Sequence, residues 1–362
     1  MNRREFVGLT MAAVAGTAVA DESGKGGTVH GVRAVLLHLG QNMWGEYLAP
    51  GEEKMLGLQY TAGHLRTDEN VWRDLTARMQ KRRYNMAVID IGEGLVFPSH
   101  PELAVKGSWS PEKLAAEVKR LKSMGIEAIP KLNFSTCHDG WLKEYGRMVA
   151  TRKYREVVKE LIDDVCEVFG NPRFFHLGLD EECSWLQSKH GVLIVRRGGA
   201  FWADFNHYLK CLERHGSQAI SFGPSHEDRD AWSSEFYRLA SKDVIISNAI
   251  YGHGWEYDKI PRWKQRAWDS FEATEKAGFT QFPCASNWVL KENVPQPLPT
   301  GKDYPQDPEA IAWFVEFCRE RIDPSRLMGF MVAPWGEIKP EHQYYWESAI
   351  DQLDEALKGK RT

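Results

Sequence analysis

An apolar segment that passes directly into three acids is the feature of the sequence best suited to chemistry. Residues 176–182 read HLGLDEE. Because side chains alternate along a strand, we expect His176 and Asp180 to share its inner face, the two leucines to pack under helices, and Glu181 to lie just past the strand end. A solvated acidic loop is the alternative, but the direct change from apolar residues to carboxylates disfavours it.

Adjacent carboxylates in a chain rich in aromatic rings suggest cleavage of a glycosidic bond. One carboxylic acid must protonate the leaving oxygen, while a second carboxylate must act as nucleophile or base, or must position a substrate group that attacks. The 14 Trp among 362 residues offer flat apolar surfaces for sugar rings. Core packing explains a single Trp equally well, but less so for Trp288 and Trp335, which stand next to expected strand ends.

These residues can act together only if the fold brings the ends of several strands to one place. The apolar pattern of the sequence predicts such a fold. Eight short apolar runs alternate with amphipathic segments, as in a parallel sheet covered by helices. We predict an α/β fold, a single-domain (β/α)8 TIM barrel over residues 33–362. A doubly wound open sheet is the alternative, but the glycine-rich ligand loop that it needs after its first strand is missing. The expected strands are 33–39, 86–91, 126–134, 174–180, 218–222, 244–250, 280–286 and 327–333.

Apolar stripes and capping residues mark the helices between these strands. Residues 151–169 place apolar side chains on one stripe, and Gly170 stands where the helix should stop. Ser110 before Pro111 predicts an N-cap followed by proline in the first turn. The expected helices are 69–82, 112–124, 151–169, 200–215, 230–240, 263–276, 307–322 and 342–358.

The active site of such a barrel is built by side chains that follow the carboxyl ends of the strands. We predict Asp180 and Glu181 as catalytic residues, with His176 as a hydrogen-bonding neighbour that contributes to substrate binding. The 12 His residues show no H-E-x-x-H spacing, so we expect no metal, and proton transfer in glycoside cleavage requires no cofactor. The other expected substrate-binding residues are His38, Asp90, Glu93, Asn133, Tyr251, Trp288, Trp335 and Glu337.

Composition excludes several other classes of partner. The chain carries 46 Lys+Arg against 50 Asp+Glu, a formal net charge of −4, which gives no electrostatic footprint for nucleic acid. After the N-terminal segment, no stretch of about 18 consecutive apolar residues is available to span a membrane. We therefore expect a carbohydrate, an oligosaccharide or glycan, as the partner.

The N-terminus predicts export. Residues 1–20 combine a charged start, an apolar stretch and an A-x-A ending, which is typical of a signal peptide. The run Arg3-Arg4-Glu5-Phe6 resembles a twin-arginine signal, with an ordinary secretion signal as the alternative. Residues 21–32 form a flexible lead-in, and the protein is expected in the periplasm or outside the cell. Twin-arginine substrates fold in the reducing cytoplasm, so we expect most of the six cysteines to be free and buried.

Three stretches in order resemble glycoside hydrolase family 20, the β-N-acetylhexosaminidases. Residues 176–181 match its H-x-G-x-D-E. Residues 101–103 read P-E-L, and a G-x-x-S sequence, a helix and the strand GIEAIP follow at 107–130. Residues 335–337 match W-x-E. The resemblance implies a barrel in which the substrate's own acetamido oxygen attacks, Glu181 is the acid and then the base, and Asp180 orients the acetamido group. Trp335 would line the sugar pocket, and Glu337 would bind sugar hydroxyls.

The sequence departs from the family where a terminal sugar is gripped. His38 and Gln41 stand where the family has Asp and Arg, and Asp90-Ile91-Gly92-Glu93 replaces its H-x-x-D. Two other functions therefore stay open. One is a barrel glycosidase in which Glu181 works with a second protein carboxylate, Glu337 or Glu93, on a sugar without an acetamido group. The other is a non-catalytic carbohydrate-binding barrel.

Overall fold

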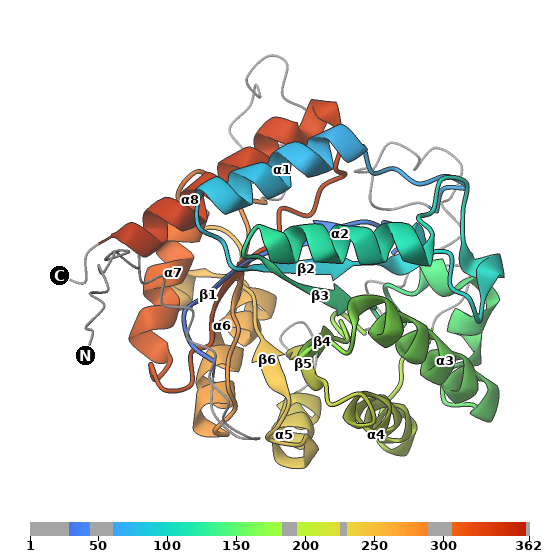
Figure 1. Cartoon of the computed structure of the whole chain (residues 1–362). Helices are drawn as coiled ribbons and strands as arrows, with labels where there is room; N and C mark the ends of the chain where they lie inside the picture. The colour runs from blue at the N-terminus through green and yellow to red at the C-terminus, as the bar shows by residue number, and fades with distance from the viewer. Residues whose placement is uncertain (1–28, 44–60, 183–193, 225–229, 289–305, 360–362) are drawn as a thin grey trace, which may run out of the picture.

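The computed structural model describes residues 29–43, 61–182, 194–224, 230–288 and 306–359. The expected signal peptide and most of the lead-in lie outside these residues. Within them, helices and strands alternate along the chain from β1 to α8 (Figure 1).

Eight parallel strands form the wall of a barrel, in the order β6-β5-β4-β3-β2-β1-β8-β7. This arrangement confirms the predicted (β/α)8 architecture. The strands are β1 (Val32–His38), β2 (Met86–Asp90), β3 (Glu127–Lys131), β4 (Phe174–His176), β5 (Gln218–Phe222), β6 (Ile245–Ser247), β7 (Cys284–Ala285) and β8 (Gly329–Val332).

The wall closes between β6 and β7 through a few backbone contacts rather than a regular ladder. Ile246 pairs with Gln281 as an isolated parallel bridge. The Phe282 amide donates to the Ile246 carbonyl at 2.8 Å, and the Cys284 amide donates to the Asn248 carbonyl at 2.9 Å. By contrast, β1 pairs with β2 over five residue positions.

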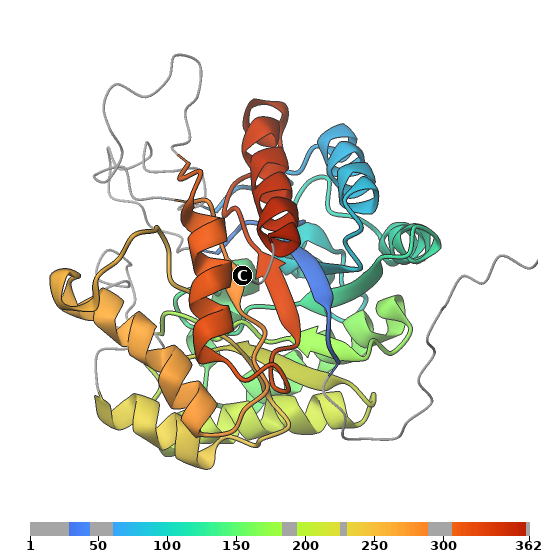
Figure 2. The same ribbon diagram turned by 90° about the vertical axis from the view of Figure 1, so that its left-hand side faces the viewer.

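Helices surround the wall, and α7, α8 and α1 lie side by side along one part of it (Figure 2). Their order along the chain follows the prediction, and most ends agree within two residues. The helices are α1 (Glu69–Lys81), α2 (Pro111–Ser123), α3 (Arg152–Phe169), α4 (Gly199–Glu213), α5 (Asp230–Leu239), α6 (Arg262–Lys276), α7 (Ala310–Arg321) and α8 (Gln343–Lys358).

Ser110 caps α2 as predicted, because its side chain accepts from the Lys113 amide. Thr151 was expected as the first residue of the next helix, but it caps α3 instead and its side chain accepts from the Tyr154 amide. Gly170 ends α3 in the left-handed region at φ 70°, which glycine adopts without steric cost. The helix expected from residue 307 begins later, at Ala310. Asp307 does not lie inside α7, because its carboxylate caps the amides of Glu309 and Ala310.

The apolar core lies in two layers because strand side chains alternate. Ala34 and Leu36 of β1 belong to the cluster inside the barrel, whereas Val35 and Leu37 belong to the larger cluster between wall and helices. His38 continues the inner face of β1 and is fully buried. Inward side chains of the strands therefore change from apolar to polar toward their carboxyl ends, where the site lies.

The fourth strand is shorter than predicted, and this corrects the expected placement of the acids. β4 ends at His176, not at residue 180. The segment beyond it contains left-handed residues, with φ values of 68° at Gly178, 69° at Leu179 and 61° at Glu181. Strand alternation therefore does not extend to the acids. Leu179 is nevertheless buried in the outer core, as expected.

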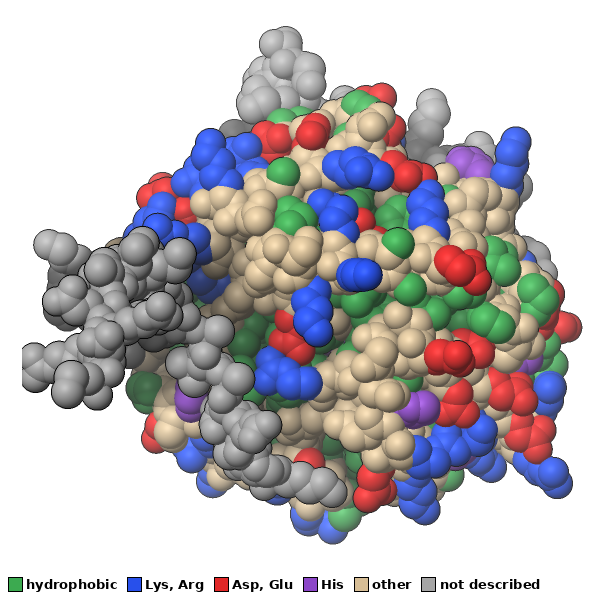
Figure 3. All heavy atoms as spheres, in the orientation of Figure 1, with side chains coloured by type: hydrophobic (Ala, Val, Ile, Leu, Met, Phe, Trp, Pro, Cys, Tyr) green, Lys and Arg blue, Asp and Glu red, His purple; other side chains and the backbone are tan. Residues whose placement is uncertain are grey.

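The surface and the described cysteines agree with the sequence analysis. In the view of Figure 3, basic and acidic side chains are interspersed. Among the described residues, no helix combines the length and hydropathy needed to cross a bilayer. The five described cysteines are free and buried, and Cys183 lies outside the described residues.

Candidate active site

The two predicted catalytic acids are joined by a histidine from the segment after β3. His138 Nε2 lies 3.1 Å from Glu181 Oε2 and 3.3 Å from Asp180 Oδ2. Asn133 Nδ2 donates to Asp180 Oδ1 at 2.8 Å. The carboxylates therefore face one imidazole at the strand-end side of the barrel, where barrel enzymes place their chemistry.

The charges of Asp180 and His138 stabilise each other. Burial alone would raise the pKa of Asp180, but His138, Lys131 and the Asn133 amide outweigh burial and hold that pKa well below its usual range. Burial likewise opposes a charge on His138, yet Asp180 and Glu181 raise its pKa to about 10. At neutral pH the site therefore holds an ionised Asp180 beside an imidazolium.

Asn133 also shapes the backbone that carries the acids. Its Oδ1 accepts hydrogen bonds from the amides of Leu179 and Ser135, both at 3.1 Å. A Cβ at Gly178 would lie 2.1 Å from that same oxygen. A side chain is thus excluded at Gly178, and the left-handed turn is fixed by a residue from the segment after β3.

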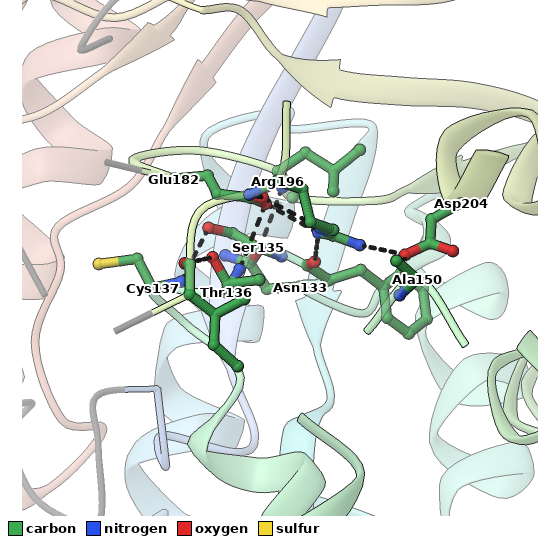
Figure 4. Close-up of polar contacts among 12 residues, drawn as sticks. Asn133, Ser135, Thr136, Cys137, Ala150, Glu182, Arg196 and Asp204 are labelled. Carbon is green, nitrogen blue, oxygen red and sulfur yellow. Dashed lines mark hydrogen bonds and ion pairs between the residues drawn. The ribbon is translucent and has the colours of Figure 1, made fainter. Parts of the chain in front are cut away.

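The third acid turns away from the pair into a buried ion network (Figure 4). Arg196 Nε and Nη2 donate to the two oxygens of Glu182 at 3.0 and 2.8 Å. Its Nη1 reaches Asp204 of α4 at 3.0 Å and the Tyr208 hydroxyl at 2.7 Å. Nη2 also donates to the Phe134 carbonyl at 2.6 Å.

All five guanidinium donors of Arg196 are thereby used. Burial opposes its charge, but Glu182 dominates among the groups that raise its pKa well above the ordinary value. Glu182 and Arg196 are 1% and 3% exposed. The residue that follows Glu181 is therefore anchored to α4 and to the segment after β3, which fixes the end of the acid-bearing turn.

A second charged group lies inside the barrel beneath the acids. Lys131 Nζ donates to Asp90 Oδ2 at 2.5 Å, and His38 Nδ1 lies 3.3 Å from the same oxygen. Burial raises the pKa of Asp90, but Lys131 and His38 lower it more. Two predicted sugar-binding residues, Asp90 and His38, thus form a buried group with Lys131, in which both Lys131 and His38 contact Asp90.

His176 contacts the backbone instead of the acid pair. Its Nδ1 accepts from the Gly178 amide at 3.0 Å, and its ring lies 4.6 Å from the Phe222 ring. Burial lowers the pKa of His176 to about 3. The imidazole is therefore neutral, and it supports the turn that leads to the acids.

Aromatic residues at or after the ends of β5, β6, β7 and β8 lie near the same end of the barrel. The Trp335 ring lies 5.6 Å from His38 and 6.2 Å from Phe222. Tyr251 and Trp288 pack edge to face at 5.8 Å. Burial raises the pKa of the Tyr251 hydroxyl, and the charges of Glu181 and Asp180 raise it further. Tyr251 therefore lies within electrostatic reach of the acid pair.

Glu337 pairs with two cationic side chains, and Glu93 accepts hydrogen bonds from backbone amides. Glu337 lies 3.5 Å from Arg66 Nη1 and 2.5 Å from Lys339 Nζ. The Glu93 carboxylate accepts from the amides of Gln41 and Asn42 after β1, at 2.7 to 3.1 Å. Burial raises the pKa of Glu93 above its ordinary value.

Four residues of this region were not selected from the sequence: His138, Lys131, Arg66 and Arg196. His138 and Lys131 lie close to the end of the third strand, where polar residues are expected at the site, and His138 stands one place from the histidine that family 20 has there. Arg66 and Arg196 lie in segments between elements. They belong to no motif, and only the tertiary structure brings them to Glu337 and Glu182.

Comparison with known proteins finds the same fold in glycoside hydrolases. A mutant β-hexosaminidase of Streptomyces plicatus in complex with GlcNAc superimposes with a TM-score of 0.59 at 11% identity, over 90% of this chain and 64% of that one. A β-N-acetylhexosaminidase of Bacteroides fragilis gives 0.54 at 14% identity, over 88% and 65%. Dispersin B gives 0.50 at 14% identity, over 81% and 96%.

These superpositions show a shared fold, and the barrel type implied by the resemblance to family 20 is confirmed. The chain spans less than two thirds of the length of the two hexosaminidases. No protein-family model matches the sequence, and no curated protein matches it.

Proposed function

We propose that the chain is a glycoside hydrolase that cleaves a β-linked N-acetylhexosaminide with the help of the substrate's acetamido group. The observation that carries the proposal is the Asp180–Glu181 pair, joined by His138 at the strand-end side of the barrel. The similarity of the fold to β-hexosaminidases supports it.

In the proposed reaction the acetamido carbonyl oxygen forms a bond to the anomeric carbon as the glycosidic bond breaks. The bonding electron pair goes to the leaving oxygen, which takes a proton from Glu181. Asp180 stays ionised next to His138 and stabilises the positive charge that develops on the acetamido group. Water then attacks the anomeric carbon and returns a proton to Glu181, and the cyclic intermediate opens.

The geometry disfavours Glu93 as a protein nucleophile for a two-carboxylate mechanism. A carboxylate nucleophile needs a lone pair directed at the anomeric carbon. Both oxygens of Glu93 instead accept backbone hydrogen bonds from the segment after β1. Glu337 remains the candidate for that mechanism, although Arg66 and Lys339 already share its charge.

The test is turnover of nitrophenyl glycosides by the wild type, Glu181→Gln and Asp180→Asn. The panel contains β-N-acetylglucosaminide, β-N-acetylgalactosaminide, β-glucoside and β-galactoside. We expect cleavage of acetamido sugars only, reduced about 10²–10⁴-fold in Glu181→Gln, as for other general acids. Glu320→Gln is the matched control, because its side chain is 71% exposed on α7.

Each alternative predicts a different result. Cleavage of the plain sugars would move the mechanism to two protein carboxylates. If no glycoside were cleaved and sugar binding were the same in the wild type and Glu181→Gln, the chain would be a binding protein. A thiazoline-type inhibitor should bind only if the acetamido group takes part.

We also propose export through the twin-arginine route, on the basis of Arg3-Arg4-Glu5-Phe6 and the A-x-A ending. Replacing both arginines with lysine should leave the full-length precursor in the cytoplasm. Fractionation followed by immunoblotting measures this. Normal export of the lysine variant would point to an ordinary secretion signal.

A further inference from the structure

A thiol lies next to the acid pair, and the proposed glycosidase chemistry does not use it. Cys137 precedes His138 in the segment after β3 and is 1% exposed. One ligand atom each from Cys137, His138 and Glu181 lie within 4.8 Å of one another. In Figure 4 the Cys137 sulfur points away from the Glu182–Arg196 network, so the thiol is not part of that network.

The three donors match the chemistry of a zinc-type cation. Thiolate, imidazole and carboxylate are the ligands that zinc takes in proteins, and open zinc sites use three protein ligands plus water. His138 Nε2 and Glu181 Oε2 are 3.1 Å apart. This distance is close to the separation of two ligand atoms on one zinc ion. Asp180 Oδ2, 3.3 Å from the same nitrogen, lies beside the triad as a further oxygen donor.

The surroundings favour a cation at this point. Asp180 and Glu181 bring two carboxylates within 3.3 Å of one imidazole nitrogen of His138. Cys137 and His138 are 1% and 2% exposed, so the sulfur and nitrogen donors are largely shielded from water. A cation bound there would gain the two carboxylates and the sulfur together.

We propose that Cys137, His138 and Glu181 bind one thiophilic divalent cation, zinc or a metal of similar preference. The cation accepts lone pairs from sulfur, nitrogen and oxygen, and the thiol and imidazolium protons leave to solvent. If Glu181 is the acid of the proposed glycosidase, an occupied site stops turnover because the carboxylate can no longer carry a proton. Metal binding itself does not depend on that function.

Cobalt(II) is the probe, because a cobalt–thiolate bond gives a charge-transfer band in the near ultraviolet. The full protein, freed of metal with EDTA and kept reduced by a phosphine, is titrated with Co²⁺. We expect one equivalent to produce the band, Zn²⁺ to remove it by displacement, and Cys137→Ser to lack it. Glu181→Gln should keep the band but weaken binding at least tenfold.

Cys211→Ser is the matched control. Cys211 is also a buried thiol, and its Sγ lies 3.5 Å from His207 Nε2, but among the described residues this pair forms no group of three donors. The variant should bind Co²⁺ as the wild type does. Absence of the band in the wild type, its survival in Cys137→Ser, or its loss in Cys211→Ser would overturn the proposal.

A measurement on the wild type keeps the test independent of variant folding. X-ray absorption of the zinc-loaded protein should show one sulfur at about 2.3 Å with lighter ligands at about 2.0–2.2 Å. A first shell without sulfur would refute the site. Glycoside turnover with and without Zn²⁺ is measured separately, so failure of metal binding and failure of the proposed glycosidase function give different results.

Discussion

Replacing Arg196 with methionine removes the cation at the centre of the Glu182–Asp204 network while keeping a long side chain. Asp204 retains a second partner, Arg155, at 2.9 Å. Among the contacts of the described residues, Glu182 retains the backbone amides of Arg196 and Thr136, at 2.7 and 3.4 Å. The variant therefore leaves one buried carboxylate without a charged partner directly behind the acid pair.

The expected cost is that of breaking a buried ion pair from one side. Such changes lower the free energy of unfolding by about 3–5 kcal/mol, because the remaining charge stays buried. At about 2 °C per kcal/mol, the lower end for large domains, the melting temperature should fall by about 6–10 °C. A loss of about 3–5 kcal/mol is a large part of the free energy of unfolding of a typical domain, about 5–15 kcal/mol.

Differential scanning calorimetry of Arg196→Met and Arg152→Met measures the difference. Arg152 also pairs with a carboxylate, Glu156 at 2.7 Å, but its side chain is 92% exposed. Exposed pairs contribute about 0–1 kcal/mol, so this control should shift the melting temperature by about 1 °C. Equal shifts in the two variants would refute the view that the network anchors the acid-bearing turn.

Two further changes test the turn and the charged interior. Gly178→Ala should lower the free energy of unfolding by more than Gly170→Ala does. Both glycines are left-handed, but of the two only Gly178 lacks room for a Cβ. Urea denaturation measures both variants, and equal losses of unfolding free energy would contradict the crowding argument. Lys131→Met should destabilise the protein at pH 7. Lys131 lowers the pKa of Asp90, so its contribution is present above the unfolded value of about 3.9 and is lost as pH falls through the folded value. The gap between wild type and variant in thermal melts should therefore narrow on acidification below about pH 4, and a gap independent of pH would contradict this assignment.

The barrel and its caps could be predicted from the sequence because they depend on local patterns. Alternating apolar runs indicated the strands of the wall, and Ser110 indicated the start of a helix. Gly170 marked the end of α3 by the same local logic. Each of these signals lies within a few residues of the feature that it predicts.

The end of β4 could not be predicted, because a tertiary contact sets it. Leu179 and Glu181 adopt left-handed φ values that non-glycine residues rarely take. The Asn133 side chain, in the segment after β3, accepts a hydrogen bond from the Leu179 amide and holds this backbone. Propensity for residues 174–180 favoured a longer strand, and the hydrogen bonds of Asn133 override it.

The roles of single site residues were predicted unevenly for a related reason. Asp180 and Glu181 were selected because they stand together in the sequence. Glu93 was selected for its position after β2, but its carboxylate accepts amides from the segment after β1. Partners such as Arg196 lie in irregular segments, where periodicity carries no information about contacts.

The segment that carries the three acids is irregular in backbone, yet it does not share the tolerance of ordinary loops to changes in length. Each acid has its own surroundings: Asp180 faces Asn133, Glu181 faces His138, and Glu182 faces Arg196. Deleting one residue would move a carboxylate out of each of these places at once. Surface loops usually accept insertions and deletions. Here the number of residues between His176 and Glu182 is itself constrained, so homologous chains should keep the length of this turn even where residues around it vary.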